Sequence, residues 1–158
     1  MAELEEHDVR AVRAANIRRG RAAGARFEDK CKKFLESLGW TADKARQAVK
    51  FIGPGRAVGT ANDFFGCVDV MAVNPDKNYT LFVQCTKDSG VGRKKRDLEA
   101  VRWNLDSQRV QVWLPLQGMR GGIRVLRLMS HGTNEREAVW VETLFRMATG
   151  VEPEGGVL

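Results

Sequence analysis

Two stretches of the sequence are the most informative about its structure: Asn62-Asp63-Phe64-Phe65-Gly66-Cys67-Val68-Asp69-Val70 and, further along, Val83-Gln84-Cys85-Thr86-Lys87. In the first, an acid follows an aromatic-glycine turn and interrupts an apolar run. The second is an apolar run that carries a polar amide and ends on a lysine. Residues 67–73 and 80–86 are typical of strands, and the Asn, Pro and Asp between them are residues that turns favour. The two stretches therefore predict an antiparallel hairpin that carries polar groups.

The polar groups of this hairpin indicate a chemical site. Because side chains alternate along a strand, Gln84 and Thr86 share one face, which suggests that this face opens onto a cleft. A buried carboxylate needs a partner or a cation, so Asp69 is either hydrogen-bonded beside a half-exposed Gln84 or a ligand of Mg²⁺. In the second case, the carbonyl oxygen of Gln84 or the main-chain carbonyl of Cys85 completes the site. Lys87 is then placed to stabilise developing charge or to help deprotonate a water.

The first forty residues have a helical composition. Residues 3–19 are rich in Ala, Glu and Arg but poor in apolar positions, so we expect a solvated helical arm. A break from Gly20 to Gly24 precedes a stronger helix over about 25–38, and Gly39 is well placed to stop it. Its apolar residues recur at spacings of three and four, as on one buried face: Phe27, Cys31, Phe34, Leu35 and Leu38.

The remaining segments complete an α/β pattern. Residues 41–50 are polar and basic, and Gly53-Pro54-Gly55 predicts a flexible loop. A basic helix, two strands and a last helix are expected at about residues 93–106, 109–115, 123–128 and 134–147. The order α-β-β-α-β-β-α predicts a single α/β domain with a mixed central β-sheet flanked by helices. We place the boundaries at 1–19 for the N-terminal helical arm, 20–149 for the domain and 150–158 for a disordered tail.

The composition favours a polyanionic partner. The chain has 158 residues, enough for one domain with its own core, and a net charge of +6. Its three cysteines, Cys31, Cys67 and Cys85, form no C-x-x-C pair and are expected to be reduced and buried. No apolar run approaches the length of a membrane span, and the N-terminus is acidic where a signal peptide is basic. We expect a cytoplasmic protein with no membrane partner.

Basic clusters are the candidate contacts to a nucleic-acid backbone, because phosphate contacts dominate non-specific affinity. Arg93-Lys94-Lys95-Arg96 is the densest cluster and follows the hairpin directly. A second cluster lies near the predicted first core helix and contains Arg18, Arg19 and Arg21. The predicted loop adds Arg56. Such runs are also found on ordinary solvated faces, so this alternative stays open.

The motifs around Glu28, Asp69 and Gln84 resemble those of the PD-(D/E)XK nuclease superfamily, and within it the Holliday-junction resolvases of archaea and phages. The helix that begins Gly24-Ala25-Arg26-Phe27-Glu28 is similar to their acid-bearing first helix. Phe82-Val83-Gln84-Cys85-Thr86 lies where the family has an apolar pair followed by E-x-K. The likeness spans about residues 20–115. It departs from the family motif at Gln84, which replaces the acid, and at Thr86, which replaces the lysine.

This resemblance implies a restriction-endonuclease-like core and a Mg²⁺- or Mn²⁺-dependent endodeoxyribonuclease that cleaves branched DNA as a homodimer. The implied metal ligands are Glu28, Asp63, Asp69 and Gln84, and Lys87 would assist the attacking water. Asp63 enters because it resembles a pattern in phage relatives whose strand reads Gln-x-Thr, and a phage source is one option for this chain.

Three alternatives stay open. A lysine from the basic cluster, Lys94 or Lys95, can take the place of Lys87. The substrate can be linear or damaged duplex, as for a phage or restriction-type nuclease. The replacements at Gln84 and Thr86 can also mark an inactive nucleic-acid-binding module of the same fold.

Overall fold

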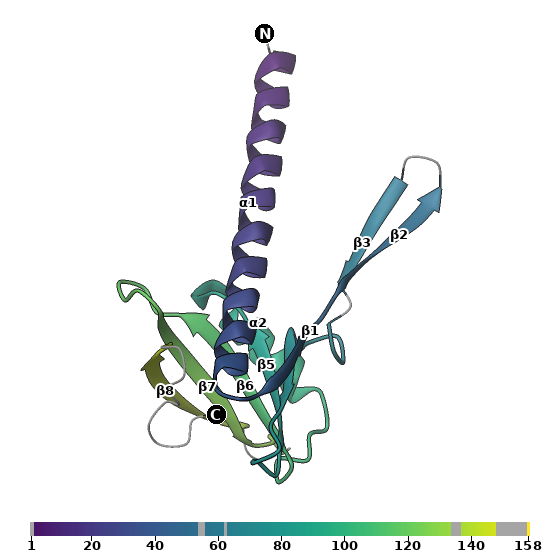
Figure 1. The fold of residues 1–158 in the computed structure, drawn as a ribbon. Coiled ribbons are helices and arrows are strands. Elements are labelled where there is room, and N and C mark those ends of the chain that lie inside the picture. The colour runs from purple at the N-terminus through teal and green to yellow at the C-terminus, as the bar shows by residue number, and fades with distance from the viewer. Residues whose placement is uncertain (1, 54–55, 62, 134–136, 148–157) are drawn as a thin grey trace.

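A six-stranded mixed sheet forms the body of the molecule, with strand order β1-β4-β5-β6-β7-β8 (Figure 1). The computed structural model describes residues 2–53, 56–61, 63–133, 137–147 and 158, with side chains in these ranges except 2–11 and 47–61. The elements are α1 (Ala2–Ser37), β1 (Thr41–Lys44), β2 (Gln47–Gly53), β3 (Arg56–Ala61), β4 (Val70–Val73), β5 (Thr80–Cys85), η1 (Asp88–Gly90), α2 (Val91–Glu99), β6 (Gln108–Pro115), β7 (Gly122–Ser130) and β8 (Val139–Arg146). The prediction of a single α/β domain with a mixed sheet is confirmed.

The predicted hairpin is the centre of this sheet. β4 and β5 pair antiparallel, with Val70 opposite Val83, and β6 then runs parallel to β5. The first strand is shorter than predicted and begins at Val70. It starts late because the chain turns through Phe65 and Gly66, which both have positive φ. Asp69 therefore lies at the mouth of the strand.

Each face of the sheet packs against one helix. On the first face, α1 buries Cys31, Phe34 and Leu35 against a cluster that includes Leu81, Val83 and Trp113. On the opposite face, α2 buries Leu98 against a cluster that includes Phe82, Val112 and Trp103. β5 therefore alternates as predicted, and both of its faces are covered. The predicted free state of the cysteines also holds for Cys31, Cys67 and Cys85.

The predicted helix break at residues 20–24 is wrong. α1 is one helix from Ala2 to Ser37 and includes both Gly20 and Gly24. Each glycine costs a helix only about 1 kcal/mol, and the neighbouring alanines and arginines are strong helix formers. The predicted stop is confirmed: Gly39 has φ +83, a conformation that glycine adopts without strain.

Three other predicted elements differ from the structure. The expected last helix over 134–147 is strand β8 from residue 139 onward, whereas 134–136 lie outside the described residues. Its Val, Trp, Thr and Phe residues favour strands, and β7 offers an unpaired edge. The predicted helix over 93–106 starts at Val91 and ends at Glu99. The polar segment and loop over 41–61 form β1 and a separate two-stranded ribbon, β2–β3.

The predicted disordered tail over 150–158 lies almost wholly outside the described residues. Leu158 is described and is buried, and its carbonyl accepts hydrogen bonds from Tyr79 and Arg109. Among the described residues, no helix has both the length and the apolar character needed to cross a membrane.

Replacing Gly20 with Ala is expected to stabilise the protein by about 0.5–1 kcal/mol, because Ala is the better residue in a helix interior. A Cβ added at Gly20 meets no atom within 4 Å. Urea unfolding followed by circular dichroism measures the change. Gly39→Ala is the control, and its positive φ predicts a loss of about 1 kcal/mol or more. A destabilised Gly20→Ala protein would show that α1 is not continuous.

Candidate active site

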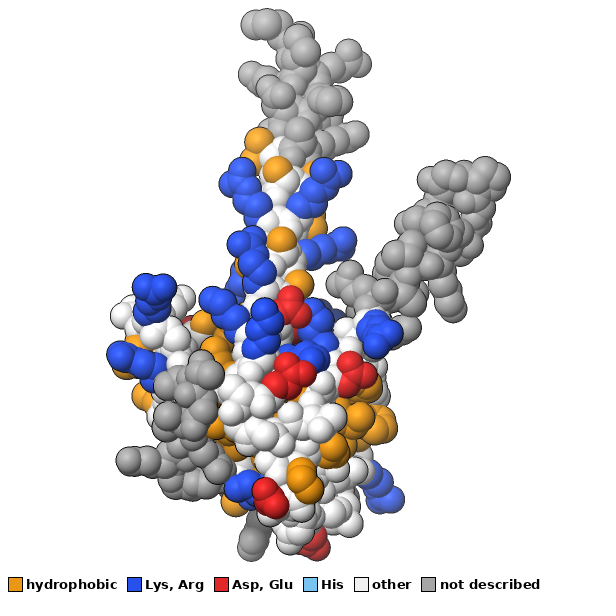
Figure 2. Space-filling model, in the orientation of Figure 1, with side chains coloured by type: hydrophobic (Ala, Val, Ile, Leu, Met, Phe, Trp, Pro, Cys, Tyr) orange, Lys and Arg blue, Asp and Glu red, His pale blue; other side chains and the backbone are white. Residues whose placement is uncertain are grey.

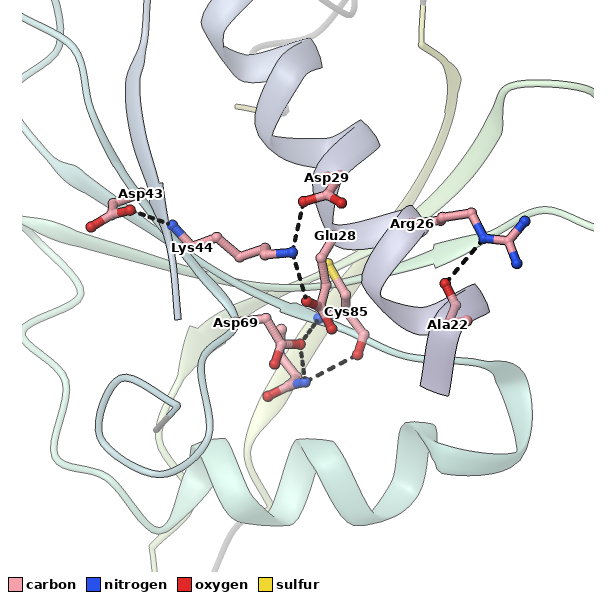
Figure 3. A network of polar contacts seen from close by, with 9 residues as sticks. Ala22, Arg26, Glu28, Asp29, Asp43, Lys44, Asp69 and Cys85 are labelled. Atoms are coloured by element: carbon pink, nitrogen blue, oxygen red, sulfur yellow. Dashed lines mark hydrogen bonds and ion pairs between the residues drawn. The ribbon is translucent and has the colours of Figure 1, made fainter. Parts of the chain in front are cut away.

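The Asp69 carboxylate is fastened to the end of β5. Its Oδ2 accepts a hydrogen bond from the Cys85 backbone N–H at 2.7 Å and a second from Gln84 Nε2 (Figure 3). The Asp69 N–H donates to the Val83 carbonyl at 3.0 Å, which continues the strand pairing beyond β4. Asp69 is 8% exposed. Asp69, which interrupts the apolar run, is therefore a buried carboxylate that accepts two hydrogen bonds.

Gln84 is buried, contrary to the expectation that its face of β5 opens onto a cleft. Its side chain is 1% exposed, because the α2 cluster covers that face. Nε2 donates to Asp69 Oδ2 and to the Cys85 carbonyl at 3.0 Å, which uses both amide hydrogens. Within the described part of the chain, Oε1 is buried without a hydrogen-bond partner. An orphaned buried acceptor calls for a ligand or ion, since burial without one carries a free-energy penalty.

α1 brings Glu28 to the same region (Figure 3). Its carboxylate is half-buried and lies 3.8 Å from Lys44 Nζ, which also contacts Asp29 at 2.6 Å. Burial raises the pKa of Glu28, and the positive charge of Lys44 opposes this rise. Glu28 and Lys44 come from α1 and β1, so the site joins elements that flank the hairpin.

The acids of the site act on one another electrostatically. Burial raises the pKa of Asp69 from its ordinary value of 3.8 to about 7, and the Cys85 N–H opposes this rise. The charges of Glu28 and Asp63 raise it further, whereas Lys94 lowers it. Glu28 and Asp63 therefore lie near enough to Asp69 for their charges to act on it. No three Asp, Glu, His or Cys side chains of the described residues already converge as a metal cage.

Lys87 and Thr86 line a pocket next to Glu28. This pocket has a volume of about 300 Å³ and opens between α1 and the end of β5. Lys87 is exposed, and Thr86 lies beside Gly90, where an added Cβ would come within 2.5 Å of Thr86 Oγ1. A side chain at position 90 would therefore require the Thr86 hydroxyl to move.

The structure distinguishes the two alternative lysines. Lys94 lies close enough to Asp69 to lower its pKa. Lys95 instead stands over the Trp140 ring, with Nζ 5.2 Å from the ring centre. Of these two lysines, Lys94 is thus the one that lies near the site, together with Lys87.

Sequence reasoning missed Lys44. It belongs to a segment that was expected to be a polar connection, and its approach to Glu28 depends on the pairing of β1 with β4. The presence of a basic residue in that segment was the only signal for it. A contact between residues so far apart in the chain requires the sheet topology.

The other predicted nucleic-acid contacts lie in different places. Arg93 pairs with Asp97 at 3.9 Å along α2, and Arg96 is exposed. Arg18, Arg19 and Arg21 are exposed on the part of α1 that extends beyond the sheet (Figures 1 and 2). Arg56 begins β3, and its side chain lies outside the described residues.

Comparison of the chain with protein-family models, with curated proteins and with solved structures finds no match.

The stability of the metal-free protein should fall as the pH rises from about 4 to about 7. Asp69 has a folded-state pKa near 7 and an ordinary value of 3.8, so within this window the folded state keeps a proton that the unfolded chain has released. This contribution of Asp69 to the free energy of unfolding is roughly 4 kcal/mol, and it is present in full below pH 4 and lost above pH 7. Asp69→Asn, which is neutral at every pH, should match the wild type at pH 4 and be more stable at pH 8. Urea unfolding in EDTA measures both proteins, and parallel pH profiles would refute the raised pKa.

Proposed function

We propose that this chain is a metal-dependent endodeoxyribonuclease that cleaves branched DNA on a restriction-endonuclease-like core. The observation that carries the proposal is Oε1 of Gln84, which is buried beside the Asp69 carboxylate and has no hydrogen-bond partner in the described part of the chain. Both amide hydrogens of Gln84 are already used, so the orphaned atom is an oxygen acceptor that a cation would satisfy.

The donor set fits Mg²⁺ or Mn²⁺. These ions prefer oxygen ligands and commonly use one or two carboxylates together with water and phosphate oxygens. Asp69 and Gln84 Oε1 supply two protein oxygens, and Glu28 and Asp63 supply further charge close by. A cation would also offset the mutual repulsion of these acids, because it attracts each of them. When bound, the metal would lower the pKa of a water and neutralise charge on the phosphate under attack.

The chain's own residues would orient and charge the site. The Cys85 N–H and the Gln84 amide hold Asp69 in one orientation. Lys87 faces the pocket beside Glu28, and Lys94 acts on Asp69 from α2. A lysine in either place would bind a phosphate oxygen and stabilise the charge that develops on it.

The setting we infer is cytoplasmic, with DNA as the partner. The net charge of +6 and the exposed arginines of α1 support a polyanionic substrate. The preference for branched DNA and the homodimer that would cut it symmetrically are supported by the motif resemblance around Glu28, Asp69 and Gln84.

A non-catalytic DNA-binding module is the second candidate function. It is favoured by the ion pair between Glu28 and Lys44, in which a lysine already neutralises an acid of the site. Gln84 would then be a structural amide that has replaced a ligand.

Cleavage of labelled DNA separates these functions. We expect paired symmetric nicks in a four-way junction with Mg²⁺ or Mn²⁺, no cutting in EDTA, and no cutting by Asp69→Ala. Equal cutting of a matched linear duplex would instead indicate a nuclease for linear or damaged DNA. Salt-sensitive binding with no metal-dependent cleavage would leave the binding module, and an active Asp69→Ala protein would refute the site.

Gln84→Glu is expected to make the protein more dependent on metal. Without metal at pH 8 it should be less stable than the wild type, because it loses two hydrogen-bond donors and gains a charge beside Asp69. Added Mg²⁺ should then raise its melting temperature more, with a dissociation constant at least about tenfold lower than that of the wild type.

Gln111→Glu is the matched control, since Gln111 is a buried amide on β6 that binds Trp113 Nε1 at 2.7 Å. It lies opposite Val83, on the other face of the sheet from Gln84. This variant should lose stability without responding to Mg²⁺. A wild type and a Gln84→Glu protein that both ignore Mg²⁺ would refute the cation site.

A further inference from the structure

Two elements project away from the sheet. The N-terminal part of α1 extends well beyond the body, and the β2–β3 ribbon leaves it as a second arm (Figure 1). α1 contacts β1, β4 and β5 only through its C-terminal part, where its buried residues lie. The fold therefore holds each arm only at its root.

The roots of both arms carry the candidate site. Glu28 lies on α1 where the helix meets the sheet. Lys44 ends β1, three residues before the ribbon begins at Gln47, and Asp63 follows the end of the ribbon at Ala61. A polymer that touches both arms near their roots is thereby brought to the pocket beside Glu28.

Each arm contains a basic stretch without an acidic residue. Residues 9–27 contain six arginines and no acidic residue: Arg10, Arg13, Arg18, Arg19, Arg21 and Arg26. Residues 44–62, which span the end of β1 and the ribbon, contain no acidic residue and four basic ones, of which Lys44 pairs with Glu28 and Asp29 and three remain: Arg46, Lys50 and Arg56. Four acids, Glu3, Glu5, Glu6 and Asp8, precede the stretch in α1, so the helix is basic from residue 9 to residue 27 and not at its outer end.

The arginines of α1 are available to a ligand. Arg13, Arg18, Arg19, Arg21 and Arg26 are exposed, and none of them has a carboxylate partner among the described residues. Figure 2 shows Lys and Arg side chains gathered along this part of the helix. At 3.6 residues per turn they are spread around the helix and do not share one face. A helix that lies on a flat anionic surface needs only one basic face.

We infer that the two arms embrace double-stranded B-form DNA, with α1 inserted in the major groove and the β2–β3 ribbon against the opposite side of the duplex. The inference rests on the proposed function and specifies its substrate as a duplex segment at the cleavage site. The major groove admits an α-helix, and its two walls present phosphates to both flanks of that helix. Arginines all around α1 match this environment, and the small alanines and glycines between them allow close approach.

The helix geometry places these contacts near the cut. Arg18 precedes Glu28 by ten residues, which corresponds to about 15 Å along the helix axis. Whatever the tilt of α1 in the groove, this distance spans at most about four to five base pairs along B-DNA, or roughly half a helical turn. The arms would therefore grip the same duplex segment that enters the site.

Duplex binding in EDTA tests this arrangement without cleavage. We would compare the wild-type protein with the variants R13Q/R18Q/R21Q and K50Q/R56Q, by fluorescence anisotropy on a 20-base-pair DNA. The helical variant should bind at least about tenfold more weakly. The slope of its log Kd against log salt concentration should be smaller by about 2–3 than that of the wild type. For the ribbon variant, this slope should be smaller than that of the wild type by about 1–2. Circular dichroism checks that α1 is intact.

The charge-matched control is R102Q/R120Q/R146Q, which changes three exposed arginines of the body. It should bind duplex DNA within about twofold of the wild type. Duplex RNA is the second control, because its deep, narrow major groove does not admit a helix. Binding to RNA should be weaker and nearly insensitive to R13Q/R18Q/R21Q.

Several outcomes would overturn the inference. Unchanged DNA affinity of R13Q/R18Q/R21Q would do so, as would an equal loss in R102Q/R120Q/R146Q or equal losses on DNA and RNA. A change of oligomeric state without a change in DNA affinity would assign the arm to a second copy of the chain. Arm-dependent binding by a protein that cuts no DNA would support the inference while refuting the nuclease proposal. Cleavage that is unchanged in the arm variants would refute the inference while supporting the nuclease proposal.

Discussion

The burial of one carboxylate constrains the centre of this structure. Asp69 sits at the mouth of β4, where a charged group without partners would cost several kcal/mol. The Cys85 N–H and the Gln84 amide meet that need, and in doing so they tie the turn before β4 to the end of β5. The same arrangement uses both hydrogens of the Gln84 amide and leaves its oxygen buried and without a partner among the described residues. The contacts that stabilise the hairpin thus also create a feature that calls for a cation, and the proposed chemistry follows from it.

The site and the arms are parts of one construction. α1 packs its C-terminal part on the sheet and brings Glu28 to the hairpin, while its N-terminal part extends into solvent with its arginines exposed (Figures 1 and 2). The ribbon leaves the sheet between Lys44 and Asp63. Long-range electrostatic attraction to DNA would therefore act on the arms, and short-range contacts to the scissile phosphate would act at their roots. This division would account for the two acid-free basic stretches at residues 9–27 and 44–62.

Local patterns in the sequence predicted the local structure well. The β4–β5 hairpin, the buried face of α1 and the stop at Gly39 all depend on neighbouring residues, and the structure confirms them. The predictions that were wrong concern features that tertiary contacts determine. The segment of β8 has apolar residues at spacings compatible with either a helix or a strand, and the free edge of β7 decides for the strand. The burial of Gln84 depends on α2, and the approach of Lys44 to Glu28 depends on β1. The local sequence alone therefore does not predict the burial of Gln84 or the contact between Lys44 and Glu28.

A crystal structure of the protein soaked in Mn²⁺, with anomalous diffraction data, tests the central claim most directly. Mn²⁺ stands in for Mg²⁺ and is visible by its anomalous signal. We expect a peak within about 2.5 Å of both an Asp69 carboxylate oxygen and Gln84 Oε1, with Glu28 turned toward it and away from Lys44. It would be contradicted by a Gln84 Oε1 that accepts a hydrogen bond from a water or a protein donor, with no Mn²⁺ beside Asp69.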